Sequence, residues 1–230
     1  MPDGQSSQLV LGIDTCGPQG SVALGRLLGQ SVEILGQIEL EGRTYSATLV
    51  AAVGKLLAHA GVAFKDIGAI VAVNGPGSFT GVRVGLSAVK GLAEAAQIPV
   101  LAVSRLEVLA WKAGIESAAL DAHRHEVFLR LGAKGGAARE LLAGAEELMG
   151  LGPTGWQIAL CDEAASALLI GAWPAISQVR IDPPTAADAL MLCAARVSQA
   201  DFVDLALLDG NYLRRSDAEI FGETAKVRGA

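Results

Sequence analysis

The chain has 230 residues, of which 51% are hydrophobic and 18% charged, and its formal net charge is −6. This composition supports a full hydrophobic core and one large or two small domains. The negative charge argues against an autonomous nucleic-acid-binding protein, because phosphate contacts need clustered lysine and arginine. Three scattered cysteines suit a reducing compartment, and no apolar stretch reaches the length of a membrane span, so we expect a cytoplasmic protein.

The first hundred residues predict a mixed sheet with flanking helices. Three apolar segments separated by turns predict a β-meander, and helical periodicity follows, alternating with two more strands. The expected strands are 8–14, 21–26, 31–40, 69–73 and 99–103, and the expected helices are 44–60 and 79–96. Antiparallel strands followed by alternating helices and strands are typical of an α/β lobe.

The second half repeats this element order in a weaker form. The expected elements are a helix at 105–113, strands at 117–121 and 126–131, a short helix near Glu146, a strand at 157–161, a helix at 163–170, a strand at 178–181 and a helix at 185–199. We therefore expect two tandem lobes, an N-terminal lobe at 1–103 and a degenerate C-terminal lobe with its tail at 104–230.

The most distinctive motif is the run N-G-P-G-S-F-T-G-V-R-V-G at residues 74–85, between a predicted strand and a predicted helix. Its glycines provide backbone that turns sharply and can be approached closely at the positive end of a helix. Such a place could hold an anion or the backbone of another protein. The run is not a Walker A loop, because Val82 and Arg83 follow Gly81, and it matches neither G-x-G-x-x-G nor G-x-S-x-G. Ser78 is expected to cap the helix rather than to act as a nucleophile.

The two predicted helices of the first lobe each carry a face of small residues beside their core face. These residues recur at a spacing of 4, 3 and 4 on both helices: Ala47, Ala51, Gly54 and Ala58, then Val84, Ala88, Gly91 and Ala95. A helix that is apolar on two faces is usually covered on both sides. Either the helices pack on each other and on the sheet, or their small faces bind a partner; the matched spacing on both helices gives the partner interface at least equal weight.

Five segments, in matching order, carry a family resemblance. They are G-I-D-T at 12–15, the glycine-rich run at 74–85, V-S-R-L-E-V-L-A at 103–110, D-A-H-R-H-E-V-F at 121–128 and Y-L-R at 212–214. Together they resemble the TsaB (YeaZ-like) family of bacterial tRNA threonylcarbamoyladenosine modification proteins, over about residues 9–214.

The resemblance implies an actin-like ATPase (ribonuclease-H-like) fold of two tandem lobes. It also implies a non-catalytic scaffold for the related subunit TsaD, which transfers a threonylcarbamoyl group to adenosine 37 of tRNAs that read ANN codons. In that family the first two helices form a bundle with TsaD, or with a second copy in a homodimer, and a TsaE-like ATPase joins the assembly. This chain would contact tRNA only indirectly, through the complex, and we expect no membrane partner.

The sequence does not support metal-assisted catalysis by this chain. The catalytic relative holds its metal with two histidines four residues apart, and the corresponding stretch at 104–110 contains none. His123 and His125 could form a metal site with nearby carboxylates, but a solvated turn is the expected interpretation. We expect no metal and no cofactor. The family commonly has a histidine where this chain has Tyr45, a change that should affect packing at the helix entry.

An alternative class is a small-molecule kinase or hydrolase of the same fold. Asp14 ends the first strand at the turn that approaches nucleotide phosphates in actin-like folds, where it could orient hydrated Mg²⁺ or simply cap its own turn. The candidate nucleotide or anion contacts are Asp14, Thr15, Gly75, Gly77, Ser78 and Gly81. The C-terminal half shows no second strong phosphate loop, so we do not expect independent ATP binding.

Overall fold

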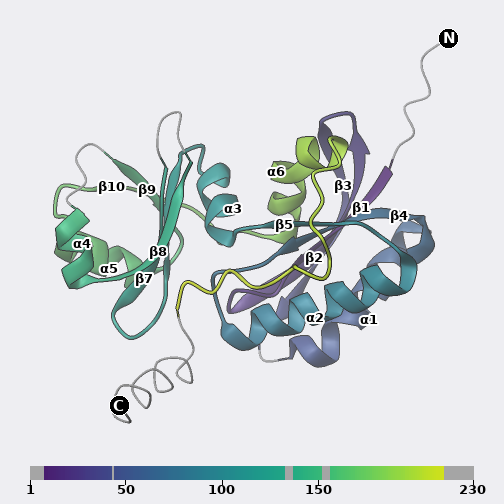
Figure 1. The fold of residues 1–230 in the computed structure, drawn as a ribbon, viewed down its shortest axis with the longest axis horizontal. Helices are drawn as coiled ribbons and strands as arrows, with labels where there is room; N and C mark the ends of the chain where they lie inside the picture. The colour runs from purple at the N-terminus through teal and green to yellow at the C-terminus, as the bar shows by residue number, and fades with distance from the viewer. Residues whose placement is uncertain (1–7, 43, 133–136, 152–155, 215–230) are drawn as a thin grey trace, which may run out of the picture.

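The computed structural model describes residues 8–42, 44–132, 137–151 and 156–214, which form two lobes side by side (Figure 1). Each lobe is built on a five-stranded sheet, with strand order β3-β2-β1-β4-β5 in the first and β10-β9-β6-β7-β8 in the second. Read from β8, the second sheet repeats the order of the first: three antiparallel strands, then two parallel ones. This confirms the predicted fold of two mixed-sheet lobes flanked by helices.

The observed elements agree with the predicted ones to within a few residues, except that one strand, β8, was not predicted. The strands are β1 (Gln8–Asp14), β2 (Gln19–Leu28), β3 (Ser31–Glu41), β4 (Ile67–Val73), β5 (Val100–Val103), β6 (Ser117–Asp121), β7 (Glu126–Leu131), β8 (Arg139–Gly144), β9 (Gln157–Leu160) and β10 (Ser177–Arg180). The helices are α1 (Tyr45–Ala60), α2 (Phe79–Ala96), α3 (Arg105–Lys112), α4 (Ala145–Leu151), α5 (Glu163–Ala172) and α6 (Ala186–Ser198), with a 3₁₀ turn η1 (Phe64–Asp66).

Helices cover both faces of each sheet. In the first lobe α1 and α2 lie side by side on one face and α6 lies on the other (Figure 1). In the second lobe α4 and α5 share one apolar core with the sheet, while α3 packs on the opposite face. The central strands β1 and β4 are consequently buried on both sides, which explains their nearly continuous apolar sequences.

The chain returns to the first lobe after completing the second sheet. Helix α6 packs on the first sheet, and its apolar residues belong to the core of that lobe. Residues 186–198 therefore pack on the first lobe, although the predicted division assigns them to the second. Residues 215–230, which that division also assigns to the second lobe, lie outside the described residues.

Residues 203–214, here called the C-terminal strap, then connect the two lobes. Val203 bridges to Val100 at the edge of the first sheet, and the Asn211 amide donates to the Asn74 carbonyl oxygen at 2.7 Å. At its far end the Arg214 guanidinium donates to the Ala122 carbonyl oxygen at 2.9 Å in the second lobe. The strap thus fixes one lobe against the other.

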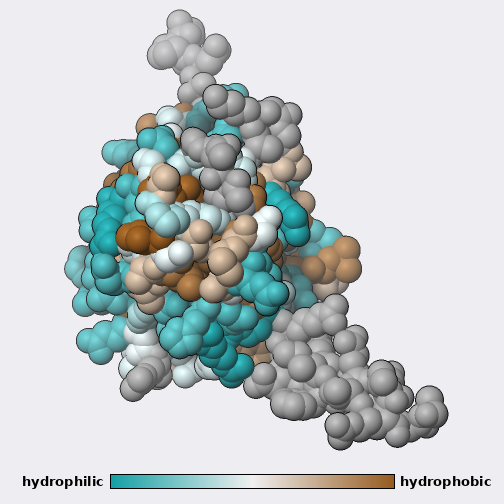
Figure 2. Space-filling view, turned by 90° about the vertical axis from the view of Figure 1, so that its left-hand side faces the viewer, coloured by the Kyte–Doolittle hydropathy of each residue, from teal (hydrophilic) through white to brown (hydrophobic). Residues whose placement is uncertain are grey.

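The end of the second lobe carries an apolar patch of its own. Figure 2 shows apolar residues gathered at the centre of this end face. Met149 in α4 is 63% exposed and Ile170 in α5 is 50% exposed.

Among the described helices, none is long and apolar enough to cross a membrane.

Candidate functional site

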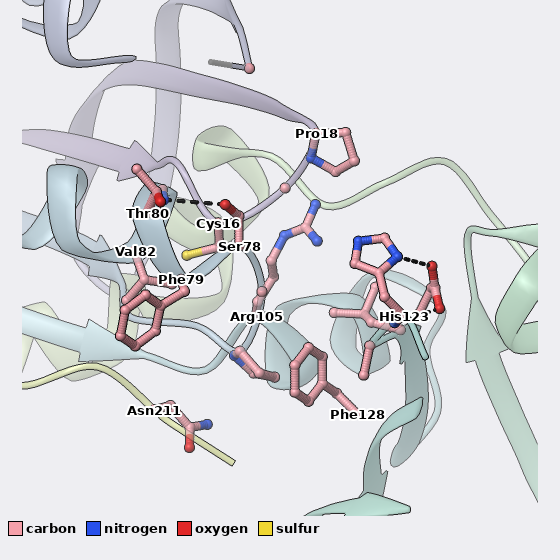
Figure 3. Close-up of a pocket in the computed structure, with 18 of the residues that line it drawn as sticks. Cys16, Pro18, Ser78, Phe79, Thr80, Val82, Arg105, His123, Phe128 and Asn211 are labelled. Carbon is pink, nitrogen blue, oxygen red and sulfur yellow. Dashed lines mark hydrogen bonds and ion pairs between the residues drawn. The ribbon is translucent and has the colours of Figure 1, made fainter. Parts of the chain in front are cut away.

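A cleft of about 1290 Å³ lies between the two lobes. The first lobe contributes the turn after β1, the loop between β4 and α2, and the first turn of α2. The second contributes the turn between β6 and β7 and the end of β9, while Arg105 of α3 lies at the base (Figure 3). Phe79 and Tyr212 stand at the rim with ring centroids 5.5 Å apart, and the Arg83 guanidinium stacks on Phe79 at 3.6 Å.

The glycine-rich run packs directly on the turn after β1. A Cβ at Gly77 would collide with the Cys16 carbonyl oxygen, and a Cβ at Gly81 would collide with the Thr15 carbonyl oxygen. The Thr15 hydroxyl donates to the Gly81 carbonyl oxygen at 2.7 Å, and the Ser78 amide donates to the Cys16 carbonyl oxygen at 2.8 Å. These glycines therefore allow the start of α2 to approach the β1 turn closely.

Ser78 has the capping role that the sequence predicts. It is the N-cap of α2, and its hydroxyl accepts a hydrogen bond from the Gly81 amide at 3.3 Å. Gly75 is buried with φ of 107°, and its carbonyl oxygen accepts from the Arg105 amide at 2.6 Å. The structure thus brings all six predicted nucleotide or anion contacts together, and most of their polar groups bond within the chain. Whether they contact a nucleotide stays a prediction.

Asp14 forms a buried ion pair across the cleft base. Its side chain is 1% exposed; one oxygen accepts from the Cys16 amide at 2.8 Å and the other faces the Arg105 Nε at 3.4 Å. Burial alone would lower the pKa of Arg105, but the neighbouring acidic groups, Asp14 above all, together outweigh burial and raise that pKa. The carboxylate proposed for Mg²⁺ is therefore already paired with a permanent cation.

Burial also keeps the neighbouring acids uncharged. It raises the pKa of the Cys16 thiol well above its ordinary value and that of Tyr45 to about 12, with the Asp14 charge adding to both shifts. The Tyr45 hydroxyl donates to the Gly17 carbonyl oxygen at 2.8 Å, and the ring packs on Gly20. Tyr45 therefore anchors the β1–β2 turn, a more specific role than the packing change predicted.

The turn between β6 and β7 has an unusual backbone. His123, Arg124 and His125 have φ of 60°, 56° and 60°, a left-handed conformation that few residues other than glycine adopt. His123 pairs with Asp121 at 2.8 Å, and Arg214 of the strap bonds to Glu126 next to this turn. Among the described residues, no group of three or more histidine, cysteine or acidic side chains is placed to hold a metal ion.

The small-residue face of α1 points away from the core, whereas on α2 Val84 and Ala88 pack against the core of the first lobe. Every predicted interface residue of α1 (Ala47, Ala51, Gly54 and Ala58) is exposed. On α2, Gly91 and Ala95 are exposed, and Val84 and Ala88 are partly buried. Val50, which is 61% exposed, extends the apolar surface of α1. A Cβ built at Gly54 or Gly91 meets no other atom within 4 Å, so both positions open to the outside.

Comparison with known proteins identifies the family. The family model described as TsaD, tRNA N6-adenosine threonylcarbamoyltransferase, matches residues 34–168, which is more than half of the chain. A crystal structure of an uncharacterized protein with similarity to peptidase YEAZ from Pseudomonas aeruginosa is 30% identical, with a TM-score of 0.72, over 91% of this chain and 100% of that one. The tRNA threonylcarbamoyladenosine biosynthesis protein TsaB of Haemophilus influenzae is 36% identical over 126 residues. The chain belongs to this family, as a TsaB/YeaZ-like member.

The curated matches cover only part of each protein. The alignment with the Haemophilus influenzae TsaB covers 52% of this chain and 51% of that protein, so the chain spans about half the length of the curated relatives it matches. The fold extends to more distant proteins: component A of (R)-2-hydroxyglutaryl-CoA dehydratase from Acidaminococcus fermentans has a TM-score of 0.50 at 11% identity, over 84% of this chain and 99% of that one.

Two charged side chains with several contacts near the cleft were missed from the sequence of this TsaB/YeaZ-like chain. Arg105 lies inside a segment noted for the family resemblance, yet its charge was not considered. Glu140, in the unpredicted strand β8, accepts hydrogen bonds from Ser104 at 2.8 Å, Arg130 at 2.9 Å and Asn211 at 2.6 Å. A charged residue two positions after a parallel strand was the available signal for Arg105, because ligands bind at the carboxyl ends of such strands.

Proposed function

We propose that this chain is a non-catalytic subunit in the formation of threonylcarbamoyladenosine at position 37 of tRNA, and that it supports a TsaD-type transferase by docking through α1 and α2. Membership of the TsaB/YeaZ-like family and the match to the TsaD family model support the pathway and the kind of partner. The observation that carries the docking surface is the exposed small-residue face of α1 beside the exposed Gly91 and Ala95 of the adjacent α2.

The exposure of these faces favours an intermolecular role. Had α1 and α2 buried their small faces against each other, Gly54 and Gly91 would contact neighbouring atoms, but a Cβ at either position meets nothing within 4 Å. The sheet already covers the opposite faces, where Leu49 and Val89 are 1% and 0% exposed. Small side chains allow two helix backbones to approach closely, and burial of apolar surface contributes about 25 cal/mol per Å². A second pair of helices, from a transferase or another copy of this chain, fits such a surface.

The cleft supports a non-catalytic role over the kinase or hydrolase alternative. A kinase of this fold would use Asp14 to orient Mg²⁺, but Arg105 stands 3.4 Å from that carboxylate and the Cys16 amide donates to its other oxygen. A bound divalent cation would have to displace or repel the guanidinium. The TsaE-like ATPase of the proposed assembly would then supply nucleotide chemistry from a separate chain.

The test is co-elution with a TsaD-type transferase on gel filtration. Ala51→Arg and Ala88→Arg each place a long charged side chain on one of the two faces, and burial of an unpaired charge costs several kcal/mol, so we expect each to weaken the complex at least about 100-fold. Ala167→Arg introduces the same change at an exposed position of α5 and should bind normally. Circular dichroism should show all three variants folded.

The biological readout is the modified nucleoside. Co-expression with the transferase, followed by nucleoside analysis of tRNA, should show loss of threonylcarbamoyladenosine for Ala51→Arg and Ala88→Arg but not for Ala167→Arg. Normal co-elution and normal modification by both face variants would refute docking through α1 and α2. Gel filtration of the chain alone reports in the same experiment whether these faces also form a homodimer.

A further inference from the structure

We propose that Arg105 forms the base of an oxyanion-binding site in the cleft between the lobes, and that this site takes a small molecule bearing a phosphate or carboxylate group. Arg105 lies outside the small-residue faces of α1 and α2, although Val84 of the α2 face also lines the cleft. Binding of an oxyanion by the chain alone can be measured without the transferase.

Arg105 is a deeply buried cation whose hydrogen-bonding capacity is mostly unused. Its side chain is 6% exposed, and its contact with Asp14 at 3.4 Å is longer than a normal N–H···O hydrogen bond. Within the ranges that the structure describes, no hydrogen bond from either terminal amino group is seen, although a guanidinium carries five N–H donors. Neither terminal amino group is a fully buried atom without a partner, so both open to the cleft, where the oxygens of a ligand could accept from them in place of water.

The guanidinium points into the cleft rather than into the protein core. Figure 3 shows it between Pro18, from the first lobe, and His123, from the second. One terminal nitrogen lies against Gly17, where any Cβ would collide with it. Gly17 thus leaves room for the guanidinium at the cleft surface, with its free edge directed toward the opposite lobe.

The groups around Arg105 leave Asp14 as its only anionic contact among the residues that the structure describes. Burial raises the pKa of the Cys16 and Cys161 thiols, so both are neutral at pH 7. Asp162 accepts from the amides of Asp121 and Ala165, and Asp121 in turn pairs with His123. The carboxylates across the cleft are therefore already bonded and do not compete for the free amino groups of Arg105.

The chemistry of a guanidinium selects the class of ligand. Its parallel N–H groups match two oxygens of a phosphate or carboxylate, and such charge-assisted pairs are the strongest hydrogen bonds in proteins. The left-handed turn at 123–125 holds the His123 ring opposite Arg105, with its Nδ1 on the Asp121 carboxylate; the imidazolium form can donate its Nε2–H to the same oxyanion. Backbone conformations of this kind persist where surrounding structure maintains them, often at ligand sites.

The test is calorimetric titration of the full chain with sodium phosphate and, separately, with sodium acetate, at constant ionic strength set by chloride. Saturable binding of one salt supports the site and identifies the ligand group as phosphate or carboxylate. Arg105→Gln should weaken that binding at least about tenfold. Arg105→Lys, which keeps the charge but loses the two parallel N–H donors of the guanidinium, should weaken it by a smaller factor. Arg26→Gln, an exposed position outside the cleft, is the matched control and should bind as the unmodified chain does.

A second variant keeps the proposal testable if Arg105→Gln does not fold. His123→Asn removes the imidazole while asparagine tolerates the left-handed backbone, and the side chain is 85% exposed, so folding should be unaffected. In titrations at acidic pH, where an imidazolium donates from both nitrogens, we expect about threefold weaker binding from the loss of one donor. Absence of saturable binding of both salts, or equal binding by the cleft variants and Arg26→Gln, overturns the proposal.

Discussion

The packing of the glycine-rich run on the β1 turn makes a quantitative prediction for Gly81→Ala. Gly81 is buried in the first turn of α2, and a Cβ there would collide with the backbone oxygen of Thr15. Since backbone cannot rotate out of the way as a side chain can, either the helix start or the turn must shift. That shift would also strain the buried hydrogen bond from the Thr15 hydroxyl to the Gly81 carbonyl oxygen.

The magnitude follows from three opposing effects. Overpacking at a tight contact costs about 1–3 kcal/mol. Loss of the buried hydrogen bond adds about 1 kcal/mol. Alanine regains about 1 kcal/mol of helix propensity relative to glycine. The net expectation is a loss of about 1–3 kcal/mol of unfolding free energy, which corresponds to a fall in Tm of roughly 2–10 °C for a chain of this size.

Gly91→Ala is the matched control, because it makes the same change further along the same helix. Its Cβ meets no atom within 4 Å, so only the propensity gain of about 0.5–1 kcal/mol remains and the variant should be stabilised. Urea unfolding of both variants, followed by far-UV circular dichroism, measures the difference. If Gly81→Ala is as stable as Gly91→Ala, Gly81 is not needed for the close approach of α2 to the β1 turn.

Two further variants test the cleft and the lobe contacts. Tyr45→Phe removes the hydrogen bond to Gly17 and should cost about 1 kcal/mol at neutral pH. Burial raises the pKa of Tyr45 from 10 to about 12, so the folded state favours the neutral phenol. The unmodified chain should therefore lose stability as the pH rises from 10 to 12. Urea unfolding of Tyr45→Phe should not show this loss. Glu140→Gln leaves Arg130 without its carboxylate partner, at a site where the two side chains are 13% and 19% exposed, and should cost about 2–3 kcal/mol by the same assay. Glu163→Gln, which breaks the exposed pair with Arg180, should change little; equal effects of the two glutamate variants would contradict the role of Glu140.

Local patterns predicted most elements because their periodicities are strong. The buried strands β1 and β4 are continuous apolar runs, and α1 and α2 carry apolar residues at helical spacing. Strand β8 was missed because its sequence, R-E-L-L-A-G, has little β-propensity. It becomes a strand by pairing with β7, a contact that no local pattern encodes.

The candidate site was harder to predict than the elements. The sequence indicated the small faces of α1 and α2, but only the structure showed that the α1 face is exposed while Val84 and Ala88 of α2 pack on the core, because helix packing depends on tertiary contacts. Arg105 and Asp14 are 91 residues apart, so their ion pair was not visible from spacing. The packing of α6 on the first sheet could not be predicted for the same reason, since the amphipathic pattern of a helix does not identify which sheet it covers.

The return of α6 to the first sheet has a consequence for biosynthesis. A nascent chain that has just completed β5 exposes one whole apolar face of its sheet, which the helix at Ala186–Ser198 later covers. Maturation of the amino-terminal half must therefore wait until residue 198 has left the ribosome. The second lobe, which has apolar cores of its own, is synthesised before the first sheet is covered on both faces.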